Sequence, residues 1–186
     1  MPVLIRNLKC AFASKKAFKK TPIFGIIVQS LGCLFISRGA TPDKKDKIVE
    51  QIGERQQLVE QLGKYPAITV FAEGSTSNGR YLLPFKRGAF AALRAVKPVI
   101  LKYSYGTLSP AWDVIPFWPL IIMHLSLFDF KCEVIELPTF TPNEYLYSQH
   151  ADKGKDKWQI YAWAVREVMS AGGDIDKIET SLADKL

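Results

Sequence analysis

Chemically useful side chains follow an apolar segment, residues 67–71, near the middle of the chain. A carboxylate, a glycine, a hydroxyl and two cations come after this segment, in the order Glu73, Gly74, Ser75, Arg80 and Lys86. Hydroxyls, cations and backbone N–H groups gathered at the end of a strand form a cradle for a phosphate or an oxyanion. The alternative interpretation is a polar turn that only joins a strand to a helix.

The elements around this polar stretch alternate between strands and helices. Compact apolar runs predict strands at residues 8–13, 33–37, 67–71, 98–103 and 132–137. Helical spacing and capping residues predict helices at about residues 21–32, 43–63, 88–96 and 156–171. The last of these carries an apolar stripe that we expect to be buried: Trp158, Tyr161, Ala162, Val165, Val168 and Met169.

Alternating strands and helices predict an α/β fold with a mixed, largely parallel sheet flanked by helices. No repeat or low-complexity linker divides the chain, which predicts a single domain over residues 1–186. Folds of this class bind ligands at the carboxyl ends of their parallel strands. Arg38 follows one predicted strand and Glu73 follows another, so both are candidates for such a site.

The net charge of +7 has a local origin. Residues 1–42 contain seven lysines and arginines and no acid, and residues 74–112 contain six and again no acid. Two basic regions predict an anionic partner such as phosphate, nucleic acid or a membrane surface, with solvated surface lysines as the alternative. We do not expect nucleic acid, because the aromatic residues near these regions have the apolar neighbours of core residues.

Cysteine usage and hydropathy favour a protein that faces the cytosol. The three cysteines have no metal-ligand spacing and are expected to be reduced, and no secretion signal is visible. The uncharged run 21–37 is interrupted by a proline and two glycines, so a helix followed by a strand is favoured over a membrane span. A second apolar run, residues 114–128, is expected to dock into one face of a membrane, and a buried hairpin is its alternative.

Three segments resemble the conserved blocks of the glycerolipid acyltransferases. Residues 71–90 resemble the third block, Phe-Pro-Glu-Gly-Thr followed by Leu-Pro-Phe-Lys-x-Gly-Ala-Phe. Residues 32–38 resemble the second block, a glycine followed by an apolar strand and an arginine, and residues 97–101 resemble the fourth. The Thr-Ser-Asn-Gly stretch of residues 76–79, the late Leu137-Pro138 and the Ala162-x-x-Val-Arg166 helix are most similar to the lysophospholipid and lysophosphatidylcholine acyltransferase branch. Two departures are Ala72, where the family has proline, and Thr76, where many members have arginine.

The resemblance implies transfer of a fatty acyl group from acyl-CoA, as co-substrate, to the free hydroxyl of a lysophospholipid, without a cofactor or metal. It implies that the acceptor is held by Arg38, Glu73, Gly74 and Ser75, with Arg80 and Lys86 as further candidates. It also implies association with the cytosolic face of a membrane, that of the endoplasmic reticulum. The oligomeric state is left open.

The family's first block, His-x-x-x-x-Asp, supplies the general base and is expected before residue 13, yet no histidine precedes His124. The pair His124 and Asp129 has the right spacing but follows the other blocks, so we expect His124 to lie on an apolar helix face. His150, in a polar loop, is a weaker candidate for the base than His124. We therefore expect an N-terminally truncated acyltransferase domain that is inactive alone, with its catalytic histidine upstream. The alternative is a catalytically inactive domain that binds lipid or acyl-CoA.

Overall fold

The structure, a computed structural model, describes residues 10–15, 24–36, 42–63, 66–74, 77, 79–106, 115–126 and 130–179. The chain divides into two compact units, residues 1–72 with 87–94 and residues 73–86 with 95–186. The single domain remains a prediction.

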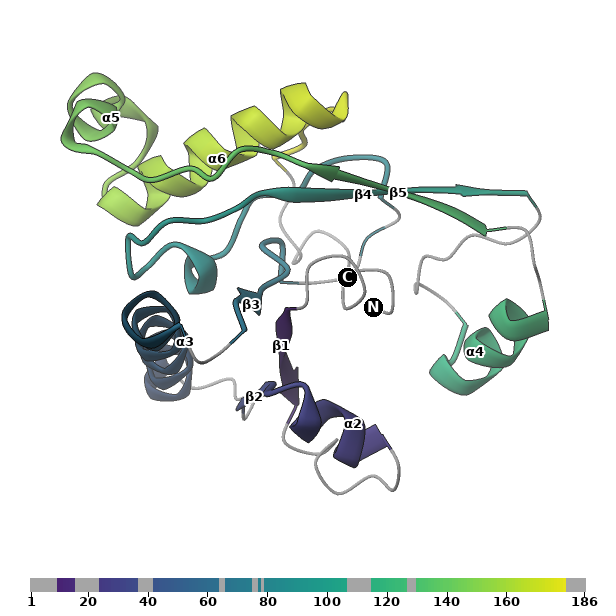
Figure 1. The fold of residues 1–186 in the computed structure, drawn as a ribbon. Coiled ribbons are helices and arrows are strands. Elements are labelled where there is room, and N and C mark those ends of the chain that lie inside the picture. The colour runs from purple at the N-terminus through teal and green to yellow at the C-terminus, as the bar shows by residue number, and fades with distance from the viewer. Residues whose placement is uncertain are drawn as a thin grey trace. The chain divides into compact units, whose positions relative to one another are not determined.

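The first unit contains a three-stranded sheet (Figure 1). Its central strand β1 (Ala11–Lys15) is parallel to both neighbours, β2 (Leu34–Ile36) and β3 (Ile68–Thr69). A central parallel strand is covered on both faces, which agrees with the burial of Cys10, Ala11 and Phe12. The parallel strands predicted around residues 8–13, 33–37 and 67–71 are thus present, although β3 is shorter than predicted.

Two helices belong to this unit, α2 (Phe24–Ser30) and α3 (Pro42–Leu62). Both were predicted, and α3 stops next to the expected glycine, Gly63. The helix predicted at residues 88–96 is wrong, because only the turn Arg87–Ala89 is helical, and it is a 3-10 helix. Leu93 has a φ of 51°, in the left-handed region, which a right-handed helix cannot continue through.

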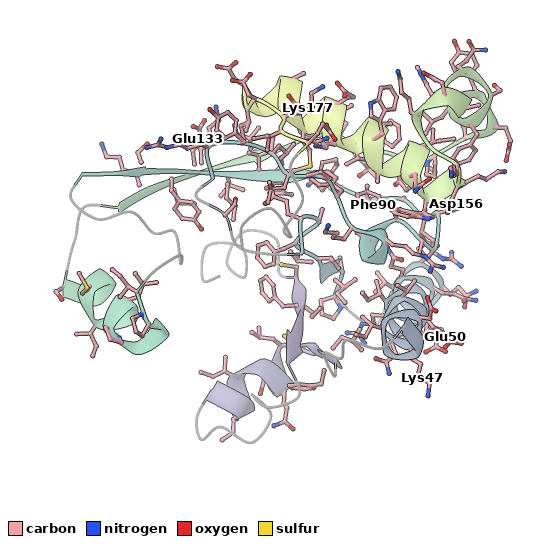
Figure 2. The ribbon with its side chains drawn as sticks, turned by 180° about the vertical axis from the view of Figure 1, so that it is seen from behind. Lys47, Glu50, Phe90, Glu133, Asp156 and Lys177 are labelled. Atoms are coloured by element: carbon pink, nitrogen blue, oxygen red, sulfur yellow. The ribbon has the colours of Figure 1, made fainter. Side chains whose placement is uncertain are left out.

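The segment after this 3-10 helix packs on α3. Ile52 of α3 and Phe90 are both buried, and Phe90 lies in the segment beside α3 (Figure 2). A Cβ on Gly53 would lie 3.4 Å from the Cβ of Ala92, so the backbone approaches α3 closely. The contact buries apolar surface without a regular helix.

The second unit is built on an antiparallel pair of strands. β4 (Val99–Tyr105) and β5 (Phe130–Glu136) are paired in register from Val99–Glu136 to Tyr105–Phe130. The long helix α6 (Lys157–Gly173) lies along this pair (Figure 1). The described part of this unit also contains two shorter helices, α4 (Phe117–Ser126) and α5 (Glu144–Gln149).

Helix α6 provides most of the core of the second unit. Its buried side chains are Ile160, Tyr161, Ala162, Ala164, Val165 and Arg166. The Tyr161 ring stacks on Phe140 with 5.7 Å between ring centroids, and its hydroxyl donates to the Phe140 carbonyl at 2.9 Å. The predicted stripe is confirmed at Tyr161, Ala162 and Val165 but is wrong at Val168, which is 39% exposed because it lies toward the solvent side of the helix.

These elements confirm the α/β class and its mixed, largely parallel sheet arrangement, with helices beside both groups of strands. Among the described residues, no helix has the length and hydrophobicity required to cross a membrane.

Candidate functional site

The polar stretch of the sequence forms a loop that closes on itself, named here the Glu73 loop, residues 73–86. Glu73 is half-buried, and its Oε1 accepts the backbone N–H of Leu83 at 3.2 Å. The Ser77 hydroxyl donates to Glu73 Oε2 in a long contact of 3.5 Å, and the same hydroxyl oxygen accepts the N–H of Gly79 at 3.3 Å. The carboxylate therefore points into the loop and orders it.

Gly74 brings the start of the loop against its end. Its φ of 71° lies in the left-handed region, where glycine is favoured. A Cβ at this position would lie 3.1 Å from Lys86 Cγ, which is closer than an ordinary van der Waals contact. The glycine thus serves both the turn and the approach of Lys86.

The far side of the loop is paired with the C-terminal segment, residues 175–179. The Leu82 N–H donates to the Asp176 carbonyl at 2.8 Å, and the Ile178 N–H donates to the Leu82 carbonyl at 3.2 Å. These bonds form a short parallel bridge between Leu82 and Lys177. Leu82 is buried, so this pairing fixes the loop from its interior side.

The loop combines one ordered carboxylate with two exposed cations, Arg80 and Lys86. A carboxylate with fixed orientation accepts hydrogen bonds from the hydroxyls of a bound polyol, whereas exposed cations attract phosphate. Together these groups are suited to a ligand that carries both hydroxyl and phosphate groups.

The structure describes four of the six predicted site residues. It brings Glu73, Gly74 and Lys86 into one loop and puts Arg80 on the same loop, one residue after Gly79. Arg38 and Ser75 lie outside the described residues. The pattern of residue types did not single out Ser77 or the backbone of Leu83, although a hydroxyl two residues before a glycine is a turn signal.

The sequence contains two histidines, His124 and His150, as candidates for a catalytic base. His124 lies in α4, as expected for an apolar helical run, but its side chain and Asp129 lie outside the described part of the chain. His150 ends α5, and its ring lies 4.8 Å from the Trp163 ring, tilted by 46°. This ring contact gives His150 a packing role in the α5–α6 region.

The pKa values of two charged groups next to His150 are shifted by the hydrogen bond between them. A hydrogen bond from Lys153 lowers the pKa of the Asp152 carboxyl, and the same bond raises the pKa of Lys153. Among the described residues, no group of three histidine, cysteine or acidic side chains is placed to hold a metal ion.

Comparison with known proteins identifies the family. The model of a family described as Acyltransferase matches residues 2–112. The lysophospholipid acyltransferase LPEAT1 of Arabidopsis thaliana is 38% identical over 94% of this chain and 42% of its own length. The lysophosphatidylcholine acyltransferase of Drosophila melanogaster is 28% identical over 94% of this chain and 31% of its own.

Lysophosphatidylcholine acyltransferase 1 of Homo sapiens is 32% identical over 84% of this chain and 27% of its own length. The chain thus spans less than half the length of these curated relatives. No solved structure matches it. Because the family model covers more than half of the chain and includes the Glu73 loop, the chain belongs to the acyltransferase family.

Proposed function

We propose that this chain holds the acceptor in an acyl-CoA-dependent lysophospholipid acyltransferase. The observation that carries the proposal is that the matched region contains the Glu73 loop, which carries an ordered carboxylate and two exposed cations. In support, the relatives that match nearly the whole chain are named for lysophospholipids.

The proposed reaction joins the free hydroxyl of a lysophospholipid to the fatty acyl carbonyl of acyl-CoA. The hydroxyl oxygen attacks the thioester carbonyl, the hydroxyl proton passes to a general base, and the C–S bond breaks to release CoA thiol. Glu73 accepts a hydrogen bond from the glycerol part of the acceptor, while Arg80 and Lys86, with Arg38 and Ser75, favour its phosphate. No described residue is assigned as the base.

Binding and transfer by the chain test this assignment separately. We expect the chain to bind a short-chain lysophosphatidylcholine, measured by calorimetry, and Glu73→Gln to weaken binding about tenfold because one charged acceptor is lost. Asn143→Ala is the matched control, because Asn143 also holds a backbone N–H but lies at the start of α5. Equal affinities for the chain and for Glu73→Gln would contradict the proposal.

Transfer is measured with labelled acyl-CoA and a lysophospholipid panel. We expect binding without transfer for this chain alone, and transfer when the chain replaces the corresponding region of the Arabidopsis relative. Transfer by the chain alone that disappears in His124→Ala would contradict our placement of the base.

We further propose that the protein works at a membrane surface, the cytosolic face of the endoplasmic reticulum. Helix α4 supports this, because Ile122 and Met123 are 65% and 41% exposed on an apolar helix. Exposed aliphatic side chains on one helix favour burial among lipid acyl chains.

Sedimentation with anionic liposomes at low salt tests the membrane proposal. We expect the chain to sediment and the double variant Ile122→Asp, Met123→Asp to remain in solution. Val168→Asp is the control, because Val168 is an exposed aliphatic residue of α6. Equal sedimentation of both variants would contradict the role of α4.

A further inference from the structure

Arg166 is a buried charged residue among the described residues of the second unit, and the proposed function does not use it. It lies on α6 among apolar side chains and is 7% exposed. Burying a guanidinium is unfavourable unless hydrogen bonds replace its water. Its partners therefore indicate what the buried charge does.

The Arg166 guanidinium binds two backbone carbonyls and one carboxylate. Its Nη2 donates to the Leu82 carbonyl at 2.8 Å and to the Ile178 carbonyl at 2.7 Å. Its Nη1 donates to Glu179 at 2.6 Å, and the Glu179 side chain is 81% exposed, so the ion pair reaches the surface. The strongest buried contacts of Arg166 thus go to the backbone where the Glu73 loop meets the C-terminal segment.

Two further contacts, just before Ile178 in the chain, hold the C-terminal segment against α6. Ser170, one turn after Arg166, donates its hydroxyl to the Ile175 carbonyl at 2.7 Å. Lys177 pairs with Glu167 of α6, and Figure 2 shows Lys177 beside this helix. Arg166 is the member of this group that also reaches the Glu73 loop.

The Leu82 carbonyl and the Leu83 N–H belong to the same peptide group. A peptide group is planar, and because no peptide bond in the described residues is cis, the C=O and N–H of this group point in opposite directions. Arg166 holds the oxygen side, and the N–H side donates to Glu73 Oε1 at 3.2 Å. A cation bound to the carbonyl oxygen also polarises the peptide and strengthens its N–H as a donor.

We propose that Arg166 is a positioning residue for Glu73, acting through the Leu82–Leu83 peptide group. The orientation of the Glu73 carboxylate, on which the proposed acceptor binding rests, is set by a guanidinium on a different element of the second unit. Arg166 itself does not touch the acceptor.

Amide hydrogen exchange of the chain tests the positioning directly, without a ligand. We expect the Leu83 amide to exchange about tenfold faster in Arg166→Gln, relative to the Val165 amide in α6, because its hydrogen bond to Glu73 weakens. Arg166→Lys keeps the charge and is expected to increase the exchange rate of the Leu83 amide by a smaller factor. If Arg166→Gln does not fold, the same measurement is made on Arg166→Lys. Ser170→Ala is the control, since it loosens the same segment without touching Leu82.

Affinity for a short-chain lysophosphatidylcholine gives the second readout in a double-mutant cycle. Arg166→Lys is expected to weaken binding about fivefold in the parent chain and to have no effect in Glu73→Gln, because the two residues act as one unit. A purely structural role would weaken binding equally in both backgrounds and would overturn the proposal. Unchanged relative exchange at Leu83, or an equal effect of Ser170→Ala, would overturn it too. If the parent chain does not bind the probe, the proposed function fails, and the exchange experiment alone decides the role of Arg166.

Discussion

The Glu73 loop and the α5–α6 corner, residues 140–163, are both rich in polar residues, but they are held in place differently. In the corner, the Asn143 side chain accepts the N–H of Leu146, and Asp156 with Gln159 forms a capping box at the start of α6. These bonds join residues three apart. In the loop, the Leu82 carbonyl is bound by Arg166, 84 residues away.

The difference separates a polar turn from a candidate site. The polar groups of the corner satisfy helix ends, which every helix requires. The carboxylate of the loop is oriented by the N–H of a peptide group, and the carbonyl oxygen of that group accepts a hydrogen bond from a buried cation. Their content of polar residues does not distinguish the two regions. The separation along the chain between the hydrogen-bonded residues does.

Arg166→Leu is expected to have the largest effect. It removes charge-assisted hydrogen bonds from the buried Leu82 carbonyl and the partly buried Ile178 carbonyl, and lowers the free energy of unfolding by about 3 kcal/mol. Urea denaturation followed by circular dichroism measures this change. A loss below about 1 kcal/mol would indicate that the loop does not depend on its distant partner.

Gly74→Ala comes next, because it tests the turn of the loop. A left-handed alanine costs about 1–2 kcal/mol, and its Cβ would crowd Lys86. Gly79→Ala is the matched control, since Gly79 has a similar φ of 73° with nothing within 4 Å of an added Cβ. Thermal denaturation of both variants measures the difference, and an equal loss would exclude a contribution from Lys86.

Asp156→Ala tests the corner. Loss of the capping box is expected to lower the free energy of unfolding by about 1 kcal/mol while leaving lysophosphatidylcholine affinity unchanged. Denaturation and calorimetry on the same preparation give both quantities. A loss of affinity as large as that of Glu73→Gln would remove the distinction between the two regions.

Tyr161→Phe is expected to have the smallest effect, a change in how the free energy of unfolding depends on pH. Burial raises the pKa of the Tyr161 phenol in the folded state. The neutral phenol therefore contributes fully to the free energy of unfolding below about pH 10, the usual pKa, and this contribution is lost as the pH rises toward the folded-state pKa. Between pH 8 and pH 10 the variant should therefore lose less stability than the parent chain, by up to about 0.4 kcal/mol. A parallel decline of both proteins in denaturation at these pH values would contradict this.

Elements with local signals were predictable from the sequence. The apolar run of β1, the charged helical pattern of α3 and the stripe of α6 depend on neighbours in the chain. The helix predicted at residues 88–96 failed because Leu93 adopts a left-handed conformation in a segment that packs on α3, and tertiary contacts overrode helical propensity.

The candidate site was predictable in its residue types but not in its support. Glu73, Gly74 and Lys86 were singled out by their residue types after a predicted strand and by resemblance to a family motif, and the structure joins them in one loop. Arg166 belonged to a family-like pattern, Ala162-x-x-Val-Arg166, which gave the arginine no role. Its carbonyl partners could not be inferred, because backbone groups are the same at every position.

The pairing of Leu82 with α6 also sets an order of events during synthesis. Arg166 follows Leu82 by 84 residues, and ribosomes add about 5–20 residues per second. Leu82 is therefore synthesised at least about 4 s before the arginine that binds its carbonyl. Until then the carboxylate and hydroxyls of the Glu73 loop remain solvated, so the loop reaches its final geometry only after α6 has been translated.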